Sequence, residues 1–255
     1  MFQLGEGEAG YWRLGPLELW LQRLAREWRY AMVSREQEEE AEPGAVEVPW
    51  SGELPAPEEA TCGRFAFRSS PERVLLQPAL ADRAVVTRPE TPLTIPAGEQ
   101  VTIYVTSPLW LQLRRDEAGA PLLEVPAVRP SDTWFGPSPL RGELAYASRT
   151  RAVLDPGQLT PCGYRAVTPL LIDNRGQDAM LVDRVLVPVP QLELWADDGP
   201  QPWTSPVVVK RRDGGKLGEV DVLAGPPEQQ PGARRIAPGR QPAEHGVVRA
   251  LASLF

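Results

Sequence analysis

The sequence of 255 residues has little of the chemistry that most enzymes and metal sites need. It contains a single histidine, His245, and two cysteines, Cys62 and Cys162, far apart and without CxxC spacing. Zinc sites are built from closely spaced cysteine and histidine ligands, and the common nucleophilic triads need a histidine. We therefore expect no metal site, no cofactor and no catalytic residues of these kinds, and we expect both cysteines to be reduced thiols.

Phosphate-binding loops and membrane-spanning runs are also missing. The sequence has no GxGxxG that leads from a predicted strand into a helix, and no GxxxxGK[ST]. It has no run of ~18 apolar residues that could cross a bilayer. The first ten residues are acidic and glycine-rich, and they lack the basic and apolar regions of a signal peptide. These absences predict a cytoplasmic protein without a transmembrane segment.

Lysine is scarce as well. Of 27 basic residues only Lys210 and Lys216 are lysines, and 34 acidic residues bring the net charge to −7. An acidic chain is repelled by phosphate backbones, so we expect no nucleic-acid partner. A local patch of arginines could override this repulsion at one place on the surface.

Proline and glycine, in contrast, are abundant, with 29 and 22 copies. Proline is excluded from helix interiors and from central strands, so this composition predicts short strands joined by punctuated loops. Alternating apolar segments support strands, for example at 64–68, 101–105, 165–172 and 207–210. The predicted fold class is all-β: one or more β-sandwiches of short antiparallel strands with long Pro/Gly-rich loops. A short C-terminal helix is one alternative for the end of the chain.

Composition divides the chain into five parts. Residues 1–34 are expected to pack on the sandwich, residues 35–60 form an acidic mobile loop, and residues 61–224 form the main β-sandwich region, as one body or two halves. Residues 225–246 have the composition of a linker, and residues 247–255 are an apolar tail.

Two of these parts leave an alternative open. The alternation of Leu17, Leu19 and Leu21 indicates a strand, and we favour a β-hairpin there, but a helical stripe through Leu17, Leu24 and Trp28 is the rival. In the tail, one face of a short helix would carry five apolar residues, Val247, Val248, Leu251, Leu254 and Phe255, of which the last four are the candidate partner-binding residues. This face could dock on its own domain or enter a groove on a partner protein.

The densest group of unusual residues lies at the centre of the chain. Residues 131–136 are expected to form a polar turn that leads into a strand over 142–151. The candidate ligand-binding residues are Asp132, Trp134, Phe135, Glu143, Tyr146, Arg149 and Arg151. Exposed aromatic rings stack on sugars or bases, and arginines bind carboxylate or phosphate.

Alternation along the expected strand places Tyr146, Ser148 and Thr150 on one face, with Arg149 and Arg151 on the other. The competing interpretation is structural. In that case Trp134 and Phe135 fill one end of the sandwich, and the arginines pair with surface acids. Asp132 and Glu143 also suggest a pair of carboxylates for glycosidase-type chemistry, the least favoured of the hypotheses.

Several segments resemble a bacterial and archaeal family called domain of unknown function 432. They are residues 14–23, 27–29, 89–93, 107–110, 131–136, 142–150, 188–190 and 248–255. The resemblance spans nearly the whole chain, apart from 35–60 and the linker after 225. The family has no assigned activity, but its genes can lie near genes of mechanosensitive channels. The resemblance therefore implies a mechanosensitive-channel-type membrane protein as one partner.

We favour a non-enzymatic, cytoplasmic β-sandwich protein that acts by protein–protein interaction. It would form a homo-oligomer or serve as an accessory to a membrane channel or envelope system. The alternative is a ligand-binding module for a carbohydrate or an anionic small molecule at the turn over 131–151. A carboxylate-based hydrolase is the third hypothesis.

Overall fold

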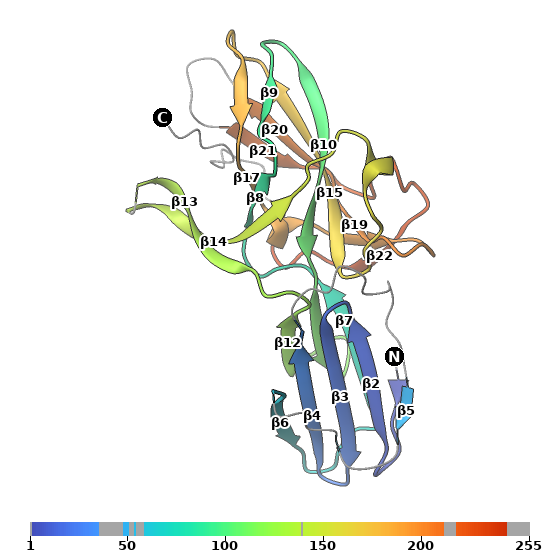
Figure 1. Cartoon of the computed structure of the whole chain (residues 1–255). Coiled ribbons are helices and arrows are strands. Elements are labelled where there is room, and N and C mark those ends of the chain that lie inside the picture. The colour runs from blue at the N-terminus through green and yellow to red at the C-terminus, as the bar shows by residue number, and fades with distance from the viewer. Residues whose placement is uncertain are drawn as a thin grey trace. The chain divides into compact units, whose positions relative to one another are not determined.

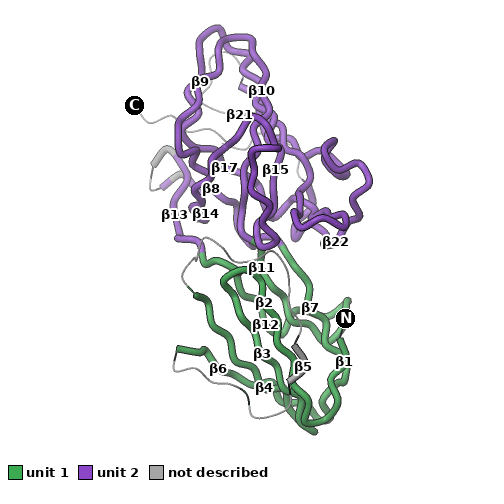
Figure 2. Tube along the Cα trace, turned by 45° about the vertical axis from the view of Figure 1, so that its right-hand side comes forward, with its two compact units in different colours: residues 1–79, 109–129 green, residues 80–108, 130–255 purple. Residues whose placement is uncertain are grey.

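The computed structural model describes residues 2–35, 48–50, 54, 59–138, 140–211 and 218–243. Strands dominate these residues, which confirms the all-β class. The helical elements among them are two 3₁₀ turns, η1 (Pro156–Gln158) and η2 (Val189–Gln191). No helix in the described ranges is long and apolar enough to cross a membrane. The chain forms two compact units (Figure 2): unit 1 is Met1–Ala79 with Leu109–Arg129, and unit 2 is Leu80–Pro108 with Pro130–Phe255.

Unit 1 contains two antiparallel sheets (Figure 1). The five-stranded sheet has the order β5-β2-β3-β4-β6, and the four-stranded sheet has the order β1-β7-β11-β12. The first comprises β2 (Ala9–Leu14), β3 (Leu17–Leu24), β4 (Glu27–Ser34), β5 (Val48–Trp50) and β6 (Thr61–Ala66). The second comprises β1 (Phe2–Gln3), β7 (Arg73–Ala79), β11 (Trp110–Arg114) and β12 (Leu123–Pro126).

One core joins the two sheets of unit 1. Trp12, Leu19 and Trp28 come from the five-stranded sheet, and Val74 and Leu113 come from the four-stranded sheet. All five side chains are buried. Apolar faces of two antiparallel sheets that share a core are the arrangement of a β-sandwich.

Residues 17–34 form the β-hairpin and not the helix. Strands β3 and β4 pair in register from Leu17↔Ser34 to Leu24↔Glu27. Leu19 is buried in the core, whereas Trp20 on the opposite face is only half-buried. The alternation of Leu17, Leu19 and Leu21 therefore correctly indicated a strand, because only alternate residues of β3 can reach the core.

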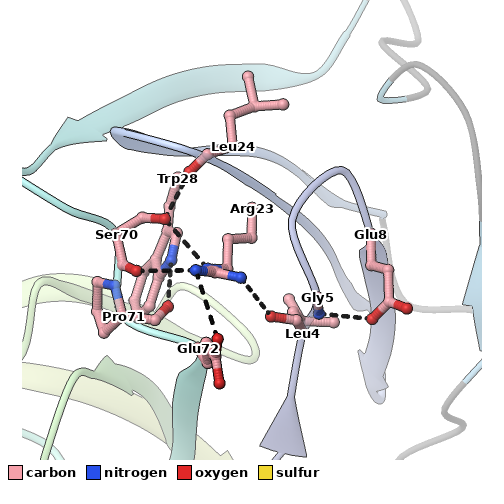
Figure 3. A network of polar contacts seen from close by, with 9 residues as sticks. All are labelled: Leu4, Gly5, Glu8, Arg23, Leu24, Trp28, Ser70, Pro71 and Glu72. Carbon is pink, nitrogen blue, oxygen red and sulfur yellow. Dashed lines mark hydrogen bonds and ion pairs between the residues drawn. The ribbon is translucent and has the colours of Figure 1, made fainter.

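The buried side chain of Arg23 connects strand β3 to the N-terminal segment and to the segment before β7 (Figure 3). The Arg23 guanidinium donates to the Leu4 carbonyl at 3.2 Å, and to both the hydroxyl and the carbonyl of Ser70 at 3.1 Å. The Trp28 indole donates to the Pro71 carbonyl at 3.1 Å. These contacts fix the segment before β7 and the N-terminal segment against the β3–β4 hairpin.

The described residues of unit 2 form three sheets, of which two are of mixed direction and one, β16-β9, is antiparallel. The largest has the order β21-β20-β15-β19-β18-β22, with β10 also paired to β15; the others are β13-β14-β8-β17 and β16-β9. Most pairs are antiparallel, but β8 with β14 and β15 with both β19 and β20 are parallel. The strands of the largest sheet are β10 (Gln100–Pro108), β15 (Arg165–Asn174), β18 (Leu194–Ala196), β19 (Trp203–Thr204), β20 (Val207–Arg211), β21 (Gly218–Val222) and β22 (Arg234–Ala237). The two smaller sheets contain β8 (Val85–Pro89), β9 (Leu93–Ile95), β13 (Ser131–Ser138), β14 (Arg141–Thr150), β16 (Met180–Val182) and β17 (Val185–Val187).

Composition predicts a linker over 225–246, but the described part of this segment, up to Ala243, is attached to unit 2. Strand β22 pairs with β18, and the Arg240 guanidinium donates to the Leu80 carbonyl at 2.5 and 2.7 Å. The Gln229 amide donates to the Tyr104 hydroxyl at 2.7 Å. Composition predicts a linker because apolar residues are few here, yet hydrogen bonds attach the segment to unit 2. The tail over 247–255 and most of the acidic segment over 35–60 lie outside the described residues.

Candidate functional site

The central stretch forms a β-hairpin arm made of β13 and β14. Residues 131–136 were expected to form a polar turn, but they belong to strand β13, which pairs with β14 from Ser131↔Ala147 to Phe135↔Glu143. The arm extends from the rest of unit 2 (Figure 1). Among the strands that the structure describes, β13 lies at the edge of its sheet, and β14 pairs with β8 on its other side.

The two adjacent aromatic residues of β13 lie on opposite faces of the arm. Trp134 is 44% exposed, whereas Phe135 is only 2% exposed. Leu144 is the direct partner of Trp134 across the hairpin and is 47% exposed, and Leu140 between the strands is 95% exposed. Three large apolar side chains of one hairpin are thus open to solvent, which is the property of an interaction surface.

The Trp134 ring lies against the backbone of Gly142. A Cβ atom at position 142 would come within 2.6 Å of Trp134 Nε1 and 2.5 Å of the Phe135 carbonyl oxygen. Real side chains do not approach so closely, so glycine is required for this contact. The indole is therefore supported on one side while 44% of the residue remains exposed.

Phe135 anchors the arm to its sheet. Its ring packs with Val86, Ala145 and Leu186, which are all buried. The Arg184 guanidinium lies 5.7 Å from the centre of the Phe135 ring, within the range of a cation–π contact. Phe135 therefore belongs to the core, as the structural interpretation of the aromatic pair expects, whereas Trp134 is exposed, as the binding interpretation expects.

A polar cluster joins the arm to the segment before β8. The Tyr146 hydroxyl donates to Asp82 at 2.9 Å, and the Arg83 guanidinium donates to Asp132 at 3.0 Å. Arg83 also lies 5.3 Å from the centre of the Tyr146 ring. Burial, and then the hydrogen bond to Asp82, raise the pKa of the Tyr146 phenol. Asp132 and Tyr146 were candidates from sequence, whereas Asp82 and Arg83 were missed.

The two candidate carboxylates do not face each other. Asp132 is opposite Tyr146 and Glu143 is opposite Phe135, so they lie on opposite faces of the hairpin. Partial burial raises the pKa of Glu143. A glycosidase needs two carboxyl groups that flank one bond, and these two side chains point to different sides of the arm.

The candidate arginines lie near the base of β14. Arg149 and Arg151 are exposed, whereas Ser148 and Thr150 between and beside them are buried. Arg149 is the direct cross-strand partner of Arg88 on the parallel strand β8. Arg88 was also missed, because a parallel pairing between distant segments leaves no local pattern in the sequence.

Two cavities of unit 2 are lined by residues other than the candidate site residues. One of about 610 Å³ is lined by Glu193, Ser205 and Arg240 among others, and one of about 390 Å³ by Pro169, Leu171 and neighbouring residues. Neither is lined by Asp132, Glu143 or Arg149. Within the described ranges no three His, Cys, Asp or Glu residues form a group that could hold a metal ion. Cys62 and Cys162 are free thiols, and His245 lies outside the described residues.

A family model described as "Protein of unknown function (DUF432)" matches residues 1–254, which confirms the resemblance seen in the sequence. No curated protein and no solved structure matches the chain.

Proposed function

We propose, since the chain belongs to this family of unknown function, that it is a non-enzymatic interaction protein whose binding element is the β13–β14 arm. The observation that carries the proposal is the exposure of Trp134, Leu140 and Leu144 on a single hairpin. Exposed tryptophan is enriched at the energetic centres of protein interfaces. The partner is a protein with an apolar groove that covers these three side chains.

The construction of the arm supports a role in docking. Phe135 and the cluster of Asp82, Arg83 and Tyr146 hold its base, and Gly142 supports the indole of Trp134. An interface residue that is already held in one position loses less conformational entropy on binding. Among the described strands β13 is also an edge strand, and such a strand offers backbone groups for pairing with a strand of the partner.

Charge favours a protein over a lipid surface as the target of the arm. Asp132 and Glu143 place two carboxyl groups on the arm, and the chain has a net charge of −7. Anionic membranes attract basic segments and repel acidic ones. A second copy of the chain and a mechanosensitive-channel-type membrane protein are the two partners to test first, the latter because of the family resemblance. We place the interaction in the cytoplasm, where free cysteines such as Cys62 and Cys162 persist.

The test uses a photo-crosslinking amino acid at Leu140 in the full-length chain. A crosslinked product of twice the chain's mass would identify a second copy, and any other product is purified and its affinity measured directly. We expect Trp134→Ser and Leu144→Ser each to weaken binding about tenfold or more. Leu181→Ser is the matched control, because Leu181 is 53% exposed elsewhere in unit 2. Equal affinity of the wild type and Trp134→Ser would refute the proposal.

A ligand-binding role for the arm is the second candidate. The observation in its favour is the supported and exposed indole of Trp134, a surface on which a sugar ring could stack. Tryptophan fluorescence in the presence of a panel of sugars tests it, with Trp134→Ser as the control. The tail residues Val248, Leu251, Leu254 and Phe255 lie outside the described residues, and their binding of a partner stays a prediction.

A further inference from the structure

Two exposed arginines lie side by side on neighbouring strands of unit 2. Arg88 on β8 and Arg149 on β14 are direct partners in the parallel pairing, and both are exposed. Adjacent strands lie about 4.8 Å apart, so the two side chains leave the sheet close together on one face. Like charges directly opposite each other destabilise a sheet.

Unit 1 contains the same arrangement in a neutralised form. Arg29 on β4 and Arg64 on β6 are also direct cross-strand partners. The carboxylate of Glu27 joins them, since Oε1 lies 2.7 Å from Arg29 and Oε2 lies 3.6 Å from Arg64. One oxyanion with two oxygens thus serves both guanidinium groups.

The pair in unit 2 lacks this carboxylate. Among the residues that the structure describes, no Asp or Glu forms an ion pair with Arg88 or Arg149. The positions two residues before them carry Val86 and Ala147, and the positions two residues after them carry Glu90 and Arg151. Glu90 makes no ion pair with either arginine, so the two adjacent positive charges remain without an internal counter-charge in this region.

We propose that Arg88 and Arg149 form a binding site for a phosphate group. Guanidinium groups bind phosphate oxygens through charge-assisted and often bidentate hydrogen bonds. A phosphate monoester carries about −1.5 to −2 at neutral pH, which matches two guanidinium charges, whereas a carboxylate matches only one. The phosphate can belong to a free metabolite-sized ester or to a phospholipid headgroup, since both offer the same oxygens.

This site is independent of the proposed docking role of the arm. Arg149 lies on the face of β14 opposite the face that carries Leu144, because the two residues are separated by an odd number of positions. Loss of phosphate binding would leave the partner-binding test unaffected, and the reverse also holds.

In the first experiment the full-length protein is titrated with inorganic phosphate at fixed ionic strength. NMR spectra record the Nε–Hε resonances of its arginines during the titration. We expect saturable shifts of Arg88 and Arg149 and no shift of Arg29. Arg88→Gln and Arg149→Gln should each weaken phosphate binding about tenfold or more. Arg64→Gln is the matched control, because it alters the pair that Glu27 already neutralises.

Thermal unfolding gives a second readout that shows whether the variants fold. Phosphate should raise the melting temperature of the wild type and of Arg64→Gln. In phosphate-free buffer Arg149→Gln should melt at the same temperature or higher, because it removes the repulsion from Arg88, and phosphate should add nothing to it. A wild type without saturable binding, or variants that bind phosphate as well as the wild type does, would overturn the proposal.

Vesicle flotation separates the two sources of phosphate. Vesicles of phosphatidylcholine with phosphatidic acid are compared with vesicles of phosphatidylcholine alone. If the wild type binds the vesicles with phosphatidic acid and Arg88→Gln does not, the phosphate belongs to a lipid headgroup. If the wild type binds inorganic phosphate but neither kind of vesicle, the phosphate belongs to a soluble ester. Vesicle binding that survives in Arg88→Gln and Arg149→Gln counts against the site.

Discussion

Trp134 rests on the backbone of Gly142, two positions before its direct cross-strand partner Leu144, with the indole nitrogen 2.6 Å from the place that a Cβ atom would occupy. The contact explains why glycine stands at this position in β14, where it otherwise weakens a strand. It also fixes the orientation of the largest exposed side chain on the arm. The position of Trp134 therefore depends on the absence of a single methyl group.

Replacement of Gly142 by alanine is expected to displace the indole and loosen the arm. The new Cβ would also meet the Phe135 carbonyl oxygen at 2.5 Å, so both the ring and the backbone must move. Such overpacking costs roughly 1–3 kcal/mol in free energy of unfolding. Acrylamide quenching of Trp134, isolated by subtraction of a Trp134→Phe variant, should increase. Hydrogen exchange of β13 and β14 should become faster.

Gly232→Ala provides the control for this substitution. No heavy atom lies within 4 Å of a Cβ built at position 232, so alanine fits there. This variant should keep the quenching and the stability of the wild type. Unchanged quenching of Trp134 in Gly142→Ala would show that the indole does not rest on the glycine.

Local alternation in the sequence predicted much of the fold and part of the site. The period of two correctly indicated the strand over 17–24, and it placed Arg149 on the face opposite Ser148. Such patterns work because a strand turns successive side chains to opposite faces. The expected turn at 131–136 failed because Asp132, Thr133 and Gly136 are turn-forming residues, while pairing with β14 over five residue positions outweighs that propensity.

The remaining partners of the site come from contacts between distant segments. Asp82 is 64 positions from Tyr146, and Arg83 is 49 positions from Asp132. No local pattern encodes such pairs, because they arise from the parallel pairing of β8 with β14. The division into two units is hidden for the same reason, since each unit is assembled from two separate stretches of chain.

Removal of the Arg23 guanidinium should destabilise unit 1. Arg23→Met keeps much of the aliphatic volume but leaves the Ser70 hydroxyl and the Leu4 and Ser70 carbonyls without this donor. Loss of hydrogen bonds from a buried charged group costs about 2–4 kcal/mol. Urea unfolding measures the loss. The ion pair with Glu72, 3.9 Å long and with Glu72 exposed, should contribute little.

Arg26→Met is the control, because Arg26 is exposed at the turn of the same hairpin. It should change the free energy of unfolding by about 0.5 kcal/mol or less. A stability of Arg23→Met equal to that of Arg26→Met would mean that the network in Figure 3 does not hold unit 1 together.

The phenol of Tyr146 makes the attachment of the arm sensitive to alkaline pH. Its pKa is raised above the ordinary tyrosine value by burial and by the hydrogen bond to Asp82. As pH rises above the ordinary value, the unfolded chain loses this proton while the folded protein keeps it. The contribution of Tyr146 to stability is therefore complete below the ordinary pKa and is lost as pH rises through the raised folded value.

Asp82→Asn removes the negative charge of Asp82, which also raises the pKa of Tyr146. The asparagine carbonyl can still accept the hydrogen bond at 2.9 Å, but the negative charge that disfavours tyrosinate is gone. The pKa of Tyr146, followed by NMR of a ring-labelled tyrosine, should fall toward the ordinary value yet remain above it, because burial persists. Tyr11 in unit 1, whose raised pKa arises from burial and from Glu18, serves as the internal control and should not change. An unchanged Tyr146 pKa in Asp82→Asn would show that the negative charge of Asp82 does not raise the pKa of the phenol.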